Sequence, residues 1–354
     1  MPGVNKELIE KAARQFTGPG ELVISSLGNG LIHQTYKATD TGNQKSIVLQ
    51  AINQAVFKNP ADILSNYHRV FQYLREKSNS ISIPAPLSTI DKQLAWIDEE
   101  NNYWRATSFI DHSYSPDIAS DEQAAYTVAK SFALFTNSLA GLNVKELKTI
   151  IPNFHNLSFR YEQFEEVIAS ASTERLLKST HIIAELRQRK KLVNWHASIM
   201  HASAYPDRVM HHDCKISNIL FNTGSGKVVC PVDLDTVMPG KFFSDLGDMI
   251  RSMACTVDEN STQWEEINIR PSFYQNILKG YLEGIGNILT DEEKNEIHHA
   301  GLVMIYMQSL RFLTDFLNND IYYKTSYPEQ NLNRALNQLI LLEKLEVYLN
   351  FSLK

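Results

Sequence analysis

Residues 210–251 read MHHDCKISNILFNTGSGKVVCPVDLDTVMPGKFFSDLGDMIR, and this stretch decides the fold. Asp213 is followed five residues later by Asn218, and an apolar segment after a glycine-containing turn ends at Asp233 and Asp235. Phosphoryl transfer needs one carboxylate to deprotonate the attacking hydroxyl and further oxygen ligands to hold Mg²⁺ on a nucleotide's phosphates. We therefore predict Asp213 as the general base, Asn218 and Asp233 as metal ligands, and Asp235 as a second-rank metal candidate.

Two short apolar segments place these side chains. Residues 228–232 (VVCPV) read as a buried strand that ends at Asp233, and residues 219–221 (ILF) read as a strand before the turn NTGSG. Asn and Gly residues between two such segments are a hairpin signal. Asn218 and Asp233 are therefore expected on paired strands.

The catalytic-loop spacing of protein kinases, H-x-D-x-x-x-x-N, recurs here at His211, Asp213 and Asn218. His212 stands where protein kinases have Arg, and the DLD string at 233–235 stands where they have D-F-G. Both departures resemble the aminoglycoside phosphotransferase branch of small-molecule kinases. Within that branch, DLDTVMPG followed by DLGDMIR is similar to the N-acetylhexosamine 1-kinase group.

The resemblance implies an α+β, two-lobed protein-kinase-like fold with a small antiparallel β N-lobe and a larger, mainly helical C-lobe. Beyond Ser108 the hydrophobic period changes from two to 3.6. We therefore expect an N-lobe at 1–107, a hinge at 108–112 and a C-lobe at 113–354. The family's cofactors are ATP and Mg²⁺, and its adenine would hydrogen-bond to the hinge backbone, here at Ser108, Phe109 and Ile110.

The N-terminal third carries strand and helix signals in the order of a kinase N-lobe. A helix is expected at 5–16 and another from Asn59-Pro60, and a five-stranded sheet is expected around residues 22–24, 35–38, 46–52, 93–97 and 103–110. Gly28-Asn29-Gly30 lies between two strands and opens no helix, which argues against a dinucleotide-binding fingerprint. It resembles the phosphate-covering loop of kinases, although a plain hairpin is common at such a position.

Two further N-lobe residues are candidates for the site. Gln50 occupies the strand position where kinases place the lysine that grips the phosphates, and a neutral amide cannot replace that charge. The N-acetylhexosamine kinase group shows a similar Leu-Gln pair there, and Lys37 and Lys45 are nearby alternatives. His33 is a substrate candidate, with a packed or surface histidine as the other interpretation.

The remainder of the chain has helical periodicity. Amphipathic helices are expected at 121–141, 158–170, 174–204, 262–283, 291–319 and 329–350. Asp245 and Asp248 are expected at the start of a helix. Acidic side chains are favoured there because the first N–H groups of a helix have no partner within the helix. The basic run at 187–191 reads as a solvated helix face.

The substrate residues rest on the resemblance. The tail from Leu310 to Arg334 and the PNFH string at 152–155 are similar to N-acetylhexosamine 1-kinases, which implies that Arg311 and Tyr322 line the sugar site. Alternatively, Arg311 pairs with Asp315 along a helix and Tyr322 belongs to the core. The family's I-R-F here ends in Ser252, so an aromatic side chain is missing.

Other chemistry at His211-His212-Asp213-Cys214 is disfavoured. Neighbouring side chains seldom converge on one metal, no distant Cys or His has ligand spacing, and nothing supports Cys214 as a nucleophile. The three cysteines form no C-x-x-C pair and indicate neither a disulfide framework nor zinc.

Composition limits the class of protein. The 354 residues are 43% hydrophobic with a net charge of −6, so the chain can fill two cores and has no basic surplus for nucleic acid. No apolar run approaches a membrane span, and the N-terminus does not resemble a signal peptide. We expect a cytoplasmic protein, monomeric or weakly dimeric, whose partners are a nucleotide and a small sugar.

The sequence thus predicts an ATP- and Mg²⁺-dependent kinase that phosphorylates the anomeric hydroxyl of an N-acetylhexosamine. The alternatives are a kinase of another small hydroxyl acceptor (aminoglycoside, choline, homoserine or methylthioribose) and a nucleotide-binding pseudokinase without turnover. Gln50 is the one feature that favours the pseudokinase, and the intact Asp213, Asn218 and Asp233 argue against it.

Overall fold

A computed structural model describes residues 5–28, 32–77 and 81–351, and its contacts divide the chain into two compact units. Unit 1 takes residues up to Tyr114 together with 141–151 and 220–238, and unit 2 takes 115–140, 152–219 and 239 onward. Unit 1 therefore includes two segments that the sequence assigned to the C-lobe. The strands at 219–222 and 228–231 form a sheet with Ser113–Tyr114. This pairing explains why the segment 220–238 belongs to unit 1.

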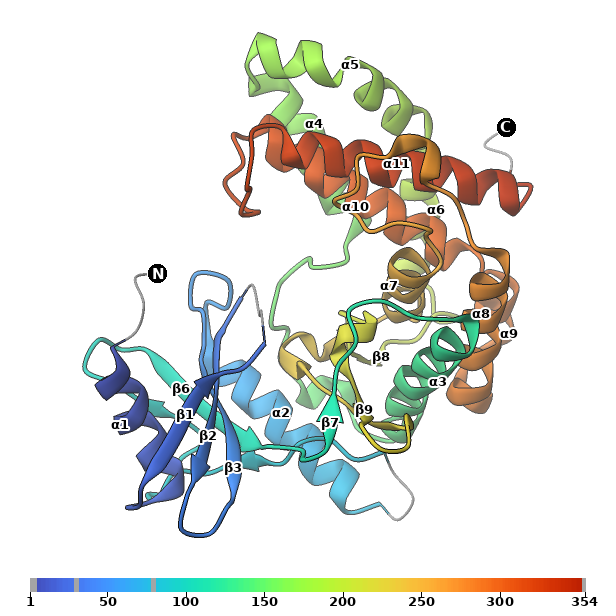
Figure 1. Ribbon diagram of the computed structural model, residues 1–354. Helices are drawn as coiled ribbons and strands as arrows, with labels where there is room; N and C mark the ends of the chain where they lie inside the picture. Colours follow the sequence, from blue (N-terminus) through green and yellow to red (C-terminus); the bar gives the residue numbers. More distant parts are fainter. Residues whose placement is uncertain (1–4, 29–31, 78–80, 352–354) are drawn as a thin grey trace. The chain divides into compact units, whose positions relative to one another are not determined.

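Unit 1 is built on an antiparallel six-stranded sheet with the order β1-β2-β3-β6-β4 and with β5 paired to β6 (Figure 1). Its strands are β1 (Leu22–Ser26), β2 (Gln34–Asp40), β3 (Ser46–Ala51), β4 (Pro86–Leu87), β5 (Trp96–Ile97) and β6 (Tyr103–Ser108). Two helices accompany the sheet, α1 (Lys6–Thr17) and α2 (Pro60–Arg75). The sequence missed β4 because its Pro86 reads as a chain breaker, but proline is tolerated at strand ends and edges.

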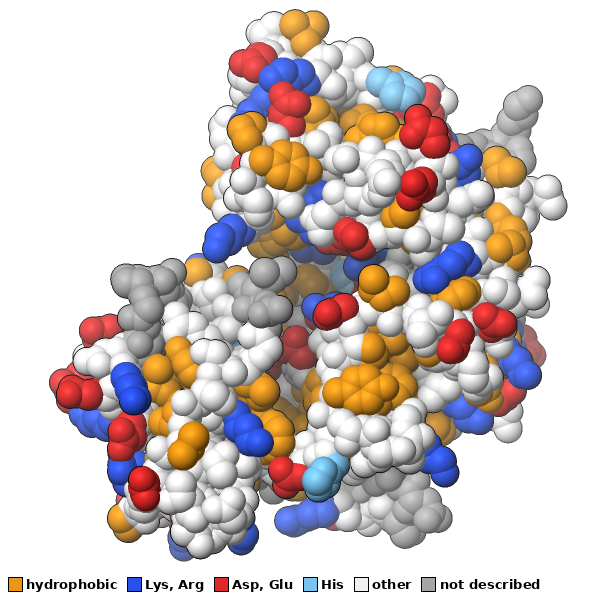
Figure 2. All heavy atoms as spheres, viewed as in Figure 1, with side chains coloured by type: hydrophobic (Ala, Val, Ile, Leu, Met, Phe, Trp, Pro, Cys, Tyr) orange, Lys and Arg blue, Asp and Glu red, His pale blue; other side chains and the backbone are white. Residues whose placement is uncertain are grey.

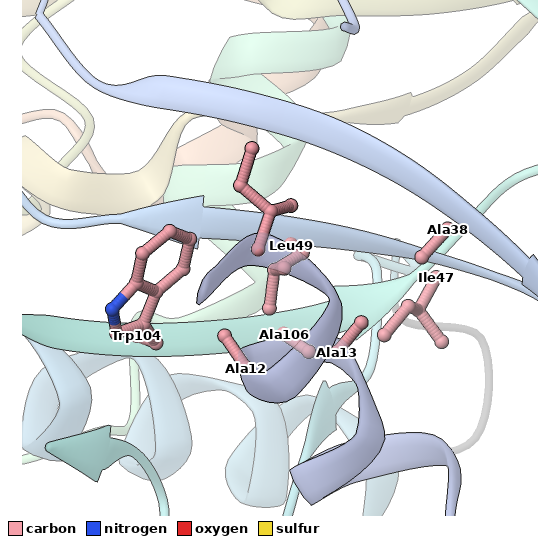
Figure 3. Close-up of a cluster of buried hydrophobic side chains, with 8 residues drawn as sticks. Ala12, Ala13, Ala38, Ile47, Leu49, Trp104 and Ala106 are labelled. Atoms are coloured by element: carbon pink, nitrogen blue, oxygen red, sulfur yellow. The ribbon is translucent and has the colours of Figure 1, made fainter. Parts of the chain in front are cut away.

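The core of unit 1 lies between α1 and the sheet. Figure 3 shows the side chains of Ala12 and Ala13 beside those of Leu49 and Trp104, and all four are buried completely. The alternation of side chains along β3 places Ile47 and Leu49 in this core and leaves Gln50 on the opposite face of the sheet. Gln50 is therefore available for polar contacts.

A small sheet with the order β10-β9-β7 completes the strands of unit 1: β7 (Ser113–Tyr114), β9 (Ile219–Asn222) and β10 (Val228–Pro231). The pairing of β9 with β10 confirms the hairpin predicted around NTGSG. Asn218 directly precedes β9, and Asp233 comes two residues after β10.

Unit 2 is mainly helical, as predicted, with a two-stranded sheet of β8 (Arg208–Met210) and β11 (Met238–Gly240). Helices α3 and α8 pack closely because Gly280 and Gly284 face α3: a Cβ on Gly280 would lie 2.2 Å from the Tyr126 carbonyl oxygen. The helices are α3 (Glu122–Ser138), α4 (Leu157–Ser170), α5 (Thr173–Gln188), α6 (Lys190–Met200), α7 (Phe243–Met253), α8 (Pro271–Ile285), α9 (Asp291–Asn295), α10 (His299–Leu317) and α11 (Gln330–Tyr348).

Three predicted helices of unit 2 differ from the observed ones. The segment 174–204 is two helices, α5 and α6, which meet at the buried Arg189. The segment 262–283 becomes an α-helix only at Pro271, because proline fits the first turn of a helix. The segment 291–319 is divided into α9 and α10.

Charges of both signs are mixed on the surface (Figure 2), and all three cysteines are buried. On the face shown in Figure 2, basic and acidic side chains are interspersed over both units. Cys214, Cys230 and Cys255 are buried free thiols. No helix in the described part of the chain is long and apolar enough to cross a lipid bilayer.

Candidate active site

The predicted base, Asp213, lies in a loop of unit 2 that follows β8. Asn218 donates its side-chain N–H to the Asp213 carboxylate at 2.8 Å and to the Asp213 carbonyl at 2.9 Å. Lys215 Nζ lies 3.1 Å from the same carboxylate, whose side chain is 29% exposed. The structure therefore brings Asp213 and Asn218 together and orients the carboxylate while leaving it accessible.

Asp245 holds this loop in place. Its two carboxylate oxygens accept hydrogen bonds from the backbone N–H groups of His211 (3.0 Å) and His212 (2.7 Å). The sequence predicted a structural role for Asp245 at the start of α7, where it would meet the helix's own N–H groups. The carboxylate instead binds the backbone of the loop that carries Asp213. A fully buried carboxylate on backbone donors stabilises the loop, since buried polar groups need partners.

His211 and His212 are structural residues. The buried His211 ring packs edge-on against Phe132 with centroids 4.9 Å apart. His212 has a left-handed backbone with φ of 67°, and its ring is packed so closely on Gly240 that an added Cβ would lie 2.4 Å from it. Glycine at 240 is therefore required by the His212 ring.

His212 is connected to the PNFH string. His212 Nδ1 lies 3.3 Å from His155 Nδ1, and both rings contact the Ser244 hydroxyl. Burial, followed by the charges of His212 and Arg311, holds the pKa of His155 well below its usual value of 6.5. The neutral His155 ring stacks on Phe154 with centroids 4.4 Å apart.

The DLD string of unit 1 has one exposed and one buried aspartate. Asp233 adopts a left-handed backbone with φ of 60° and ψ of 57° after β10, and its side chain is exposed. This conformation is uncommon for a residue other than glycine, and Asp and Asn are among the residues that tolerate it best. The sharp turn separates the direction of Asp233 from that of Asp235, which is buried.

Asp235 is bound within unit 1 by two side chains. Its carboxylate forms a buried ion pair with Arg105, including an Nη2–Oδ2 hydrogen bond of 2.7 Å, and lies 2.5 Å from His33 Nε2. Burial raises the pKa of Asp235, but Arg105 and His33 outweigh it and hold that pKa well below its ordinary range. These contacts favour a structural role for Asp235 over the predicted role as a metal ligand.

Arg105 is a residue that the sequence did not single out. It lies on β6 directly opposite Gln50 on β3, and its guanidinium donates to Gln50 Oε1 at 2.8 and 3.0 Å. The expected strand lysine is absent, but the adjacent strand supplies a buried cation on the same face of the sheet. Residues that pair directly across two strands lie on the same face of the sheet. The register that pairs Arg105 with Gln50 would have identified Arg105, but the sequence does not give this register.

His33 is packed inside unit 1. Its side chain is 6% exposed, its ring stacks on Phe57, and its Nδ1 accepts the Asn53 N–H at 3.0 Å. Both ring nitrogens thus have protein partners. This geometry agrees with the packed-histidine alternative and leaves the substrate role of His33 as an untested prediction.

The glycine loop is described only in part. Gly28 has a positive φ of 70°, a conformation for which glycine is suited, while Asn29 and Gly30 lie outside the described residues. In the hinge, Ser108 N–H donates to Ala85 and Phe109 N–H donates to Ser46. The sheet therefore uses two of the backbone donors that the sequence assigned to adenine.

A cluster of basic and aromatic side chains in unit 2 contains both predicted substrate residues. The Arg311 guanidinium carbon lies 5.3 Å from the Phe154 ring centroid, 5.8 Å from Tyr322 and 5.5 Å from Tyr323. Tyr322 is 58% exposed, so it is not a core residue.

The helical pair of Arg311 with Asp315 is absent from the described contacts. Asp315 instead accepts the backbone N–H groups of Tyr322 (2.7 Å) and Tyr323 (2.9 Å), and Arg311 donates to Gln308 at 3.1 Å. Asp315 thereby orients the tyrosine segment beside Arg311. Ser252, which stands where the resemblance expects an aromatic residue, donates to the carbonyl of Asp248 within α7.

The remaining acid of α7, Asp248, pairs with Arg251 at 2.9 Å, and Arg251 also binds Glu259 at 2.6 Å. Glu259 in turn pairs with Arg334. Asp248 is thus structural, as predicted, but through this ion-pair chain rather than through a helix N-terminus. The two acids and two arginines of the chain balance one another.

The two side chains predicted as first-rank metal ligands each offer an oxygen atom. Asn218 commits its N–H group to Asp213, which leaves the amide oxygen as its metal-binding atom, and Asp233 offers an exposed carboxylate. Amide and carboxylate oxygens are ligands that Mg²⁺ prefers. Within residues 5–28, 32–77 and 81–351, no three His, Cys, Asp or Glu side chains converge as a metal-binding group.

Comparison with known proteins places these features in a family. Residues 23–289 match the model of the "Phosphotransferase enzyme family", APH. An aminoglycoside phosphotransferase from Alicyclobacillus acidocaldarius superposes with a TM-score of 0.66 at 12% identity, covering 99% of this chain and 95% of its own. These matches confirm the predicted kinase-like fold.

Two further solved structures have similar folds. A spectinomycin phosphotransferase solved with ADP and spectinomycin has a TM-score of 0.61 at 13% identity, covering 97% of this chain and 100% of its own. A choline kinase from Cryptosporidium parvum has a TM-score of 0.59 at 12% identity, covering 98% of this chain and 97% of its own.

Proposed function

Because the chain belongs to the APH phosphotransferase family, we propose that it transfers the γ-phosphoryl group of ATP to the anomeric hydroxyl of an N-acetylhexosamine. The family match shows a phosphotransferase, and the kinase spacing H-x-D-x-x-x-x-N is complete. The observation that carries the proposal is the Asp213 carboxylate, which Asn218 orients at 2.8 Å and which remains partly exposed. This is the arrangement that a general base for a hydroxyl acceptor requires.

In the proposed reaction, Asp213 accepts the proton of the sugar hydroxyl as that hydroxyl attacks the γ-phosphate. Asn218 keeps the carboxylate directed, and Asp245 holds the backbone of the loop. Asn218 and Asp233 would hold Mg²⁺, which neutralises phosphate charge when bound. Catalysis then consists of positioning and charge neutralisation, and no phosphoenzyme forms.

The nucleotide is proposed to be ATP. The similar spectinomycin phosphotransferase was solved with ADP, which supports an adenine nucleotide. We assign the phosphate-covering role to the loop at Gly28. We assign the adenine contact to the hinge backbone at Ile110, because the sheet uses the N–H groups of Ser108 and Phe109. Gln50 would contribute through its hydrogen bonds with Arg105 rather than through a charge of its own.

The sugar preference is supported by Arg311 and Tyr322. Arg311 can donate hydrogen bonds to sugar oxygens, and the exposed Tyr322 offers a ring face and a hydroxyl. Kinases of other small hydroxyl acceptors, such as aminoglycosides and choline, are the alternatives. The similar structures include enzymes named for both acceptors.

An acceptor panel tests the proposal. ADP release with Mg²⁺-ATP is measured on N-acetylglucosamine, N-acetylgalactosamine, glucose, galactose, choline, homoserine and kanamycin, with phosphorus NMR of the product. We expect an anomeric sugar phosphate from an N-acetylhexosamine. Turnover on choline or kanamycin alone would refute the sugar assignment.

An Asp213→Asn variant tests the base. We expect kcat to fall by about 10²–10⁴-fold, the usual contribution of general base catalysis, with nucleotide affinity unchanged. The matched control is Asp207→Asn, which changes an exposed aspartate that directly precedes β8 and pairs with Lys241. Undiminished turnover in the Asp213 variant would remove Asp213 from the mechanism.

A further inference from the structure

Arg160 and Arg311 differ from most arginines of unit 2 in their partners. Arg189 pairs with Glu346, Arg208 with Glu293, and Arg251 with Asp248 and Glu259. Among the described residues, no carboxylate lies within 4 Å of a guanidinium nitrogen of Arg160 or Arg311. These two cations therefore lack the neutralisation that the same unit gives to Arg189, Arg208 and Arg251. Arg270, which donates to the Met253 carbonyl, has no carboxylate partner in the described part of the chain either.

The polar contacts of Arg160 are few and neutral. Its guanidinium donates to Gln163 at 2.9 Å and to the Phe154 carbonyl at 3.4 Å, and its Nε is buried without a hydrogen-bond partner. Burial, with Arg311 as the next cause, lowers the pKa of Arg160 to about 10. A desolvated guanidinium beside a like charge is unfavourable unless an electron-rich group comes to it.

Arg311 faces the same site from α10. Its contacts are the Gln308 side chain and the rings of Phe154, Tyr322 and Tyr323. Ring faces attract a cation but leave its in-plane N–H groups directed elsewhere. Phe154 lies against both arginines, because its carbonyl accepts from Arg160 and its ring lies under Arg311.

This arginine pair is linked to the catalytic loop within unit 2. Phe154 stacks on His155, His155 Nδ1 lies 3.3 Å from His212 Nδ1, and His212 directly precedes Asp213. Each step is a packed contact. Packed side chains therefore connect the arginine pair to the residue that precedes the proposed base.

We propose that Arg160 and Arg311 form a charge filter in the acceptor site, which binds a carbonyl or carboxylate oxygen of the acceptor and rejects an ammonium group. The filter rests on the proposed function and specifies its substrate class: N-acylated or acidic sugars are accepted, and free amino sugars are excluded. Two guanidinium groups donate to one oxygen, whereas an ammonium group brings a third positive charge and no acceptor atom.

A site with two cations would distinguish this chain from a kinase of cationic acceptors. Removal of one unneutralised arginine should weaken the rejection of an ammonium group. Since loss of a merely structural residue would not improve the binding of any sugar, tighter binding of an amino sugar is the diagnostic result.

The experiment measures binding by calorimetry with a non-hydrolysable ATP analogue present, in slightly acidic buffer where sugar amines are protonated. The probes are N-acetylglucosamine, glucosamine and glucuronate. We compare wild type with Arg160→Gln, Arg311→Gln and the charge-conserving Arg160→Lys. The matched control is Arg187→Gln, which removes an arginine that already pairs with Glu165.

We expect wild type to bind N-acetylglucosamine and glucuronate, and to bind glucosamine at least about 100-fold more weakly, a ratio equal to about 2.8 kcal/mol. Each Gln variant should bind glucosamine about tenfold more tightly and glucuronate more weakly. Arg160→Lys keeps the positive charge and should still reject glucosamine, while Arg187→Gln keeps the wild-type pattern. Thermal melts before titration exclude variants that fail to fold.

Three outcomes would overturn the filter: equal affinity of wild type for glucosamine and N-acetylglucosamine, unchanged glucosamine affinity in both Gln variants, or no binding of any of the three sugars. Turnover measured in parallel separates the two proposals. Selective binding without phosphoryl transfer refutes the reaction and keeps the filter, whereas equal turnover of amino and N-acetyl sugars keeps the reaction and refutes the filter.

Discussion

Each unit buries arginine near a candidate functional residue, but Arg105 of unit 1 and the Arg160–Arg311 pair of unit 2 differ in how their charge is balanced. In unit 1, Arg105 is 4% exposed and paired with the equally buried Asp235. In unit 2, Arg160 and Arg311 contact amides, a carbonyl and aromatic rings. A buried cation with its own carboxylate serves the fold, whereas a cation without one is suited to a ligand.

The largest effect is expected from removing the acid of unit 1. Asp235→Ala leaves Arg105 buried and unpaired, which should cost about 3–5 kcal/mol in the free energy of unfolding. Urea denaturation measures the loss, and hydrogen exchange in the β3 and β6 peptides locates it. Glu174→Ala, which removes an exposed partner of Lys178, should leave the urea midpoint unchanged. Equal urea midpoints for Asp235→Ala and wild type would contradict a structural role for the pair.

The opposite result is expected at the cation of unit 2. Arg311→Met removes a like charge beside Arg160 and should change the free energy of unfolding by less than about 1 kcal/mol in either direction. The matched control is Arg208→Met, which leaves the buried Glu293 carboxylate without its cation. This variant should lower the free energy of unfolding by about 3–5 kcal/mol. If the two Met variants were destabilised equally, the distinction between the two kinds of arginine would be lost.

A simple anion should distinguish the two sites without mutation of the fold. If sulfate occupies the Arg160–Arg311 site with a Kd near ~10 mM, 100 mM sulfate adds about 1.4 kcal/mol of stability. Differential scanning calorimetry at matched ionic strength should show a higher Tm in sulfate than in chloride. Sulfate also stabilises proteins generally, so the test is whether Arg311→Gln loses part of this increment and Arg187→Gln does not.

The smallest effect is expected on the pKa of His155. Because the positive charge of Arg311 helps to lower that pKa, Arg311→Met should raise it, while burial still holds it below 6.5. A depressed folded-state pKa means that stability falls as the pH drops below the unfolded-state value, since the unfolded chain gains the proton first. Histidine NMR titration measures the shift, and an unaltered pKa would place Arg311 farther from His155 than the cluster implies.

Local patterns were sufficient for most elements of the fold. The β9–β10 hairpin, the helix that begins at Pro60 and the change to helical periodicity in the C-terminal two thirds all follow from spacing and turn residues. The single helix predicted at 174–204 was wrong, because the segment forms two helices that meet at Arg189. Arg189 read as part of a solvated basic face, but it is buried against Glu185 and Glu346, and the latter lies 157 residues away.

The candidate site divides in the same way. Asp213 and Asn218 are five residues apart, so their hydrogen bond follows from a local loop that the motif already encodes. Arg105 and Asp235 are 130 residues apart, and Arg160 and Arg311 belong to different helices. The hydrophobic periodicity of a single segment cannot predict which residues of remote segments lie together.

The sequence alone determined which residues we propose for the chemistry, because the H-x-D-x-x-x-x-N and DLD strings offer a candidate base and candidate metal ligands at fixed spacing. Only the tertiary structure decided which charges are neutralised. Strand register sets Arg105 beside Gln50 and provides Asp235 as its counter-ion, while helix packing brings Arg160 and Arg311 together around Phe154 with none. Charge compensation depends on distances between remote segments, and those distances exist only after the chain has folded.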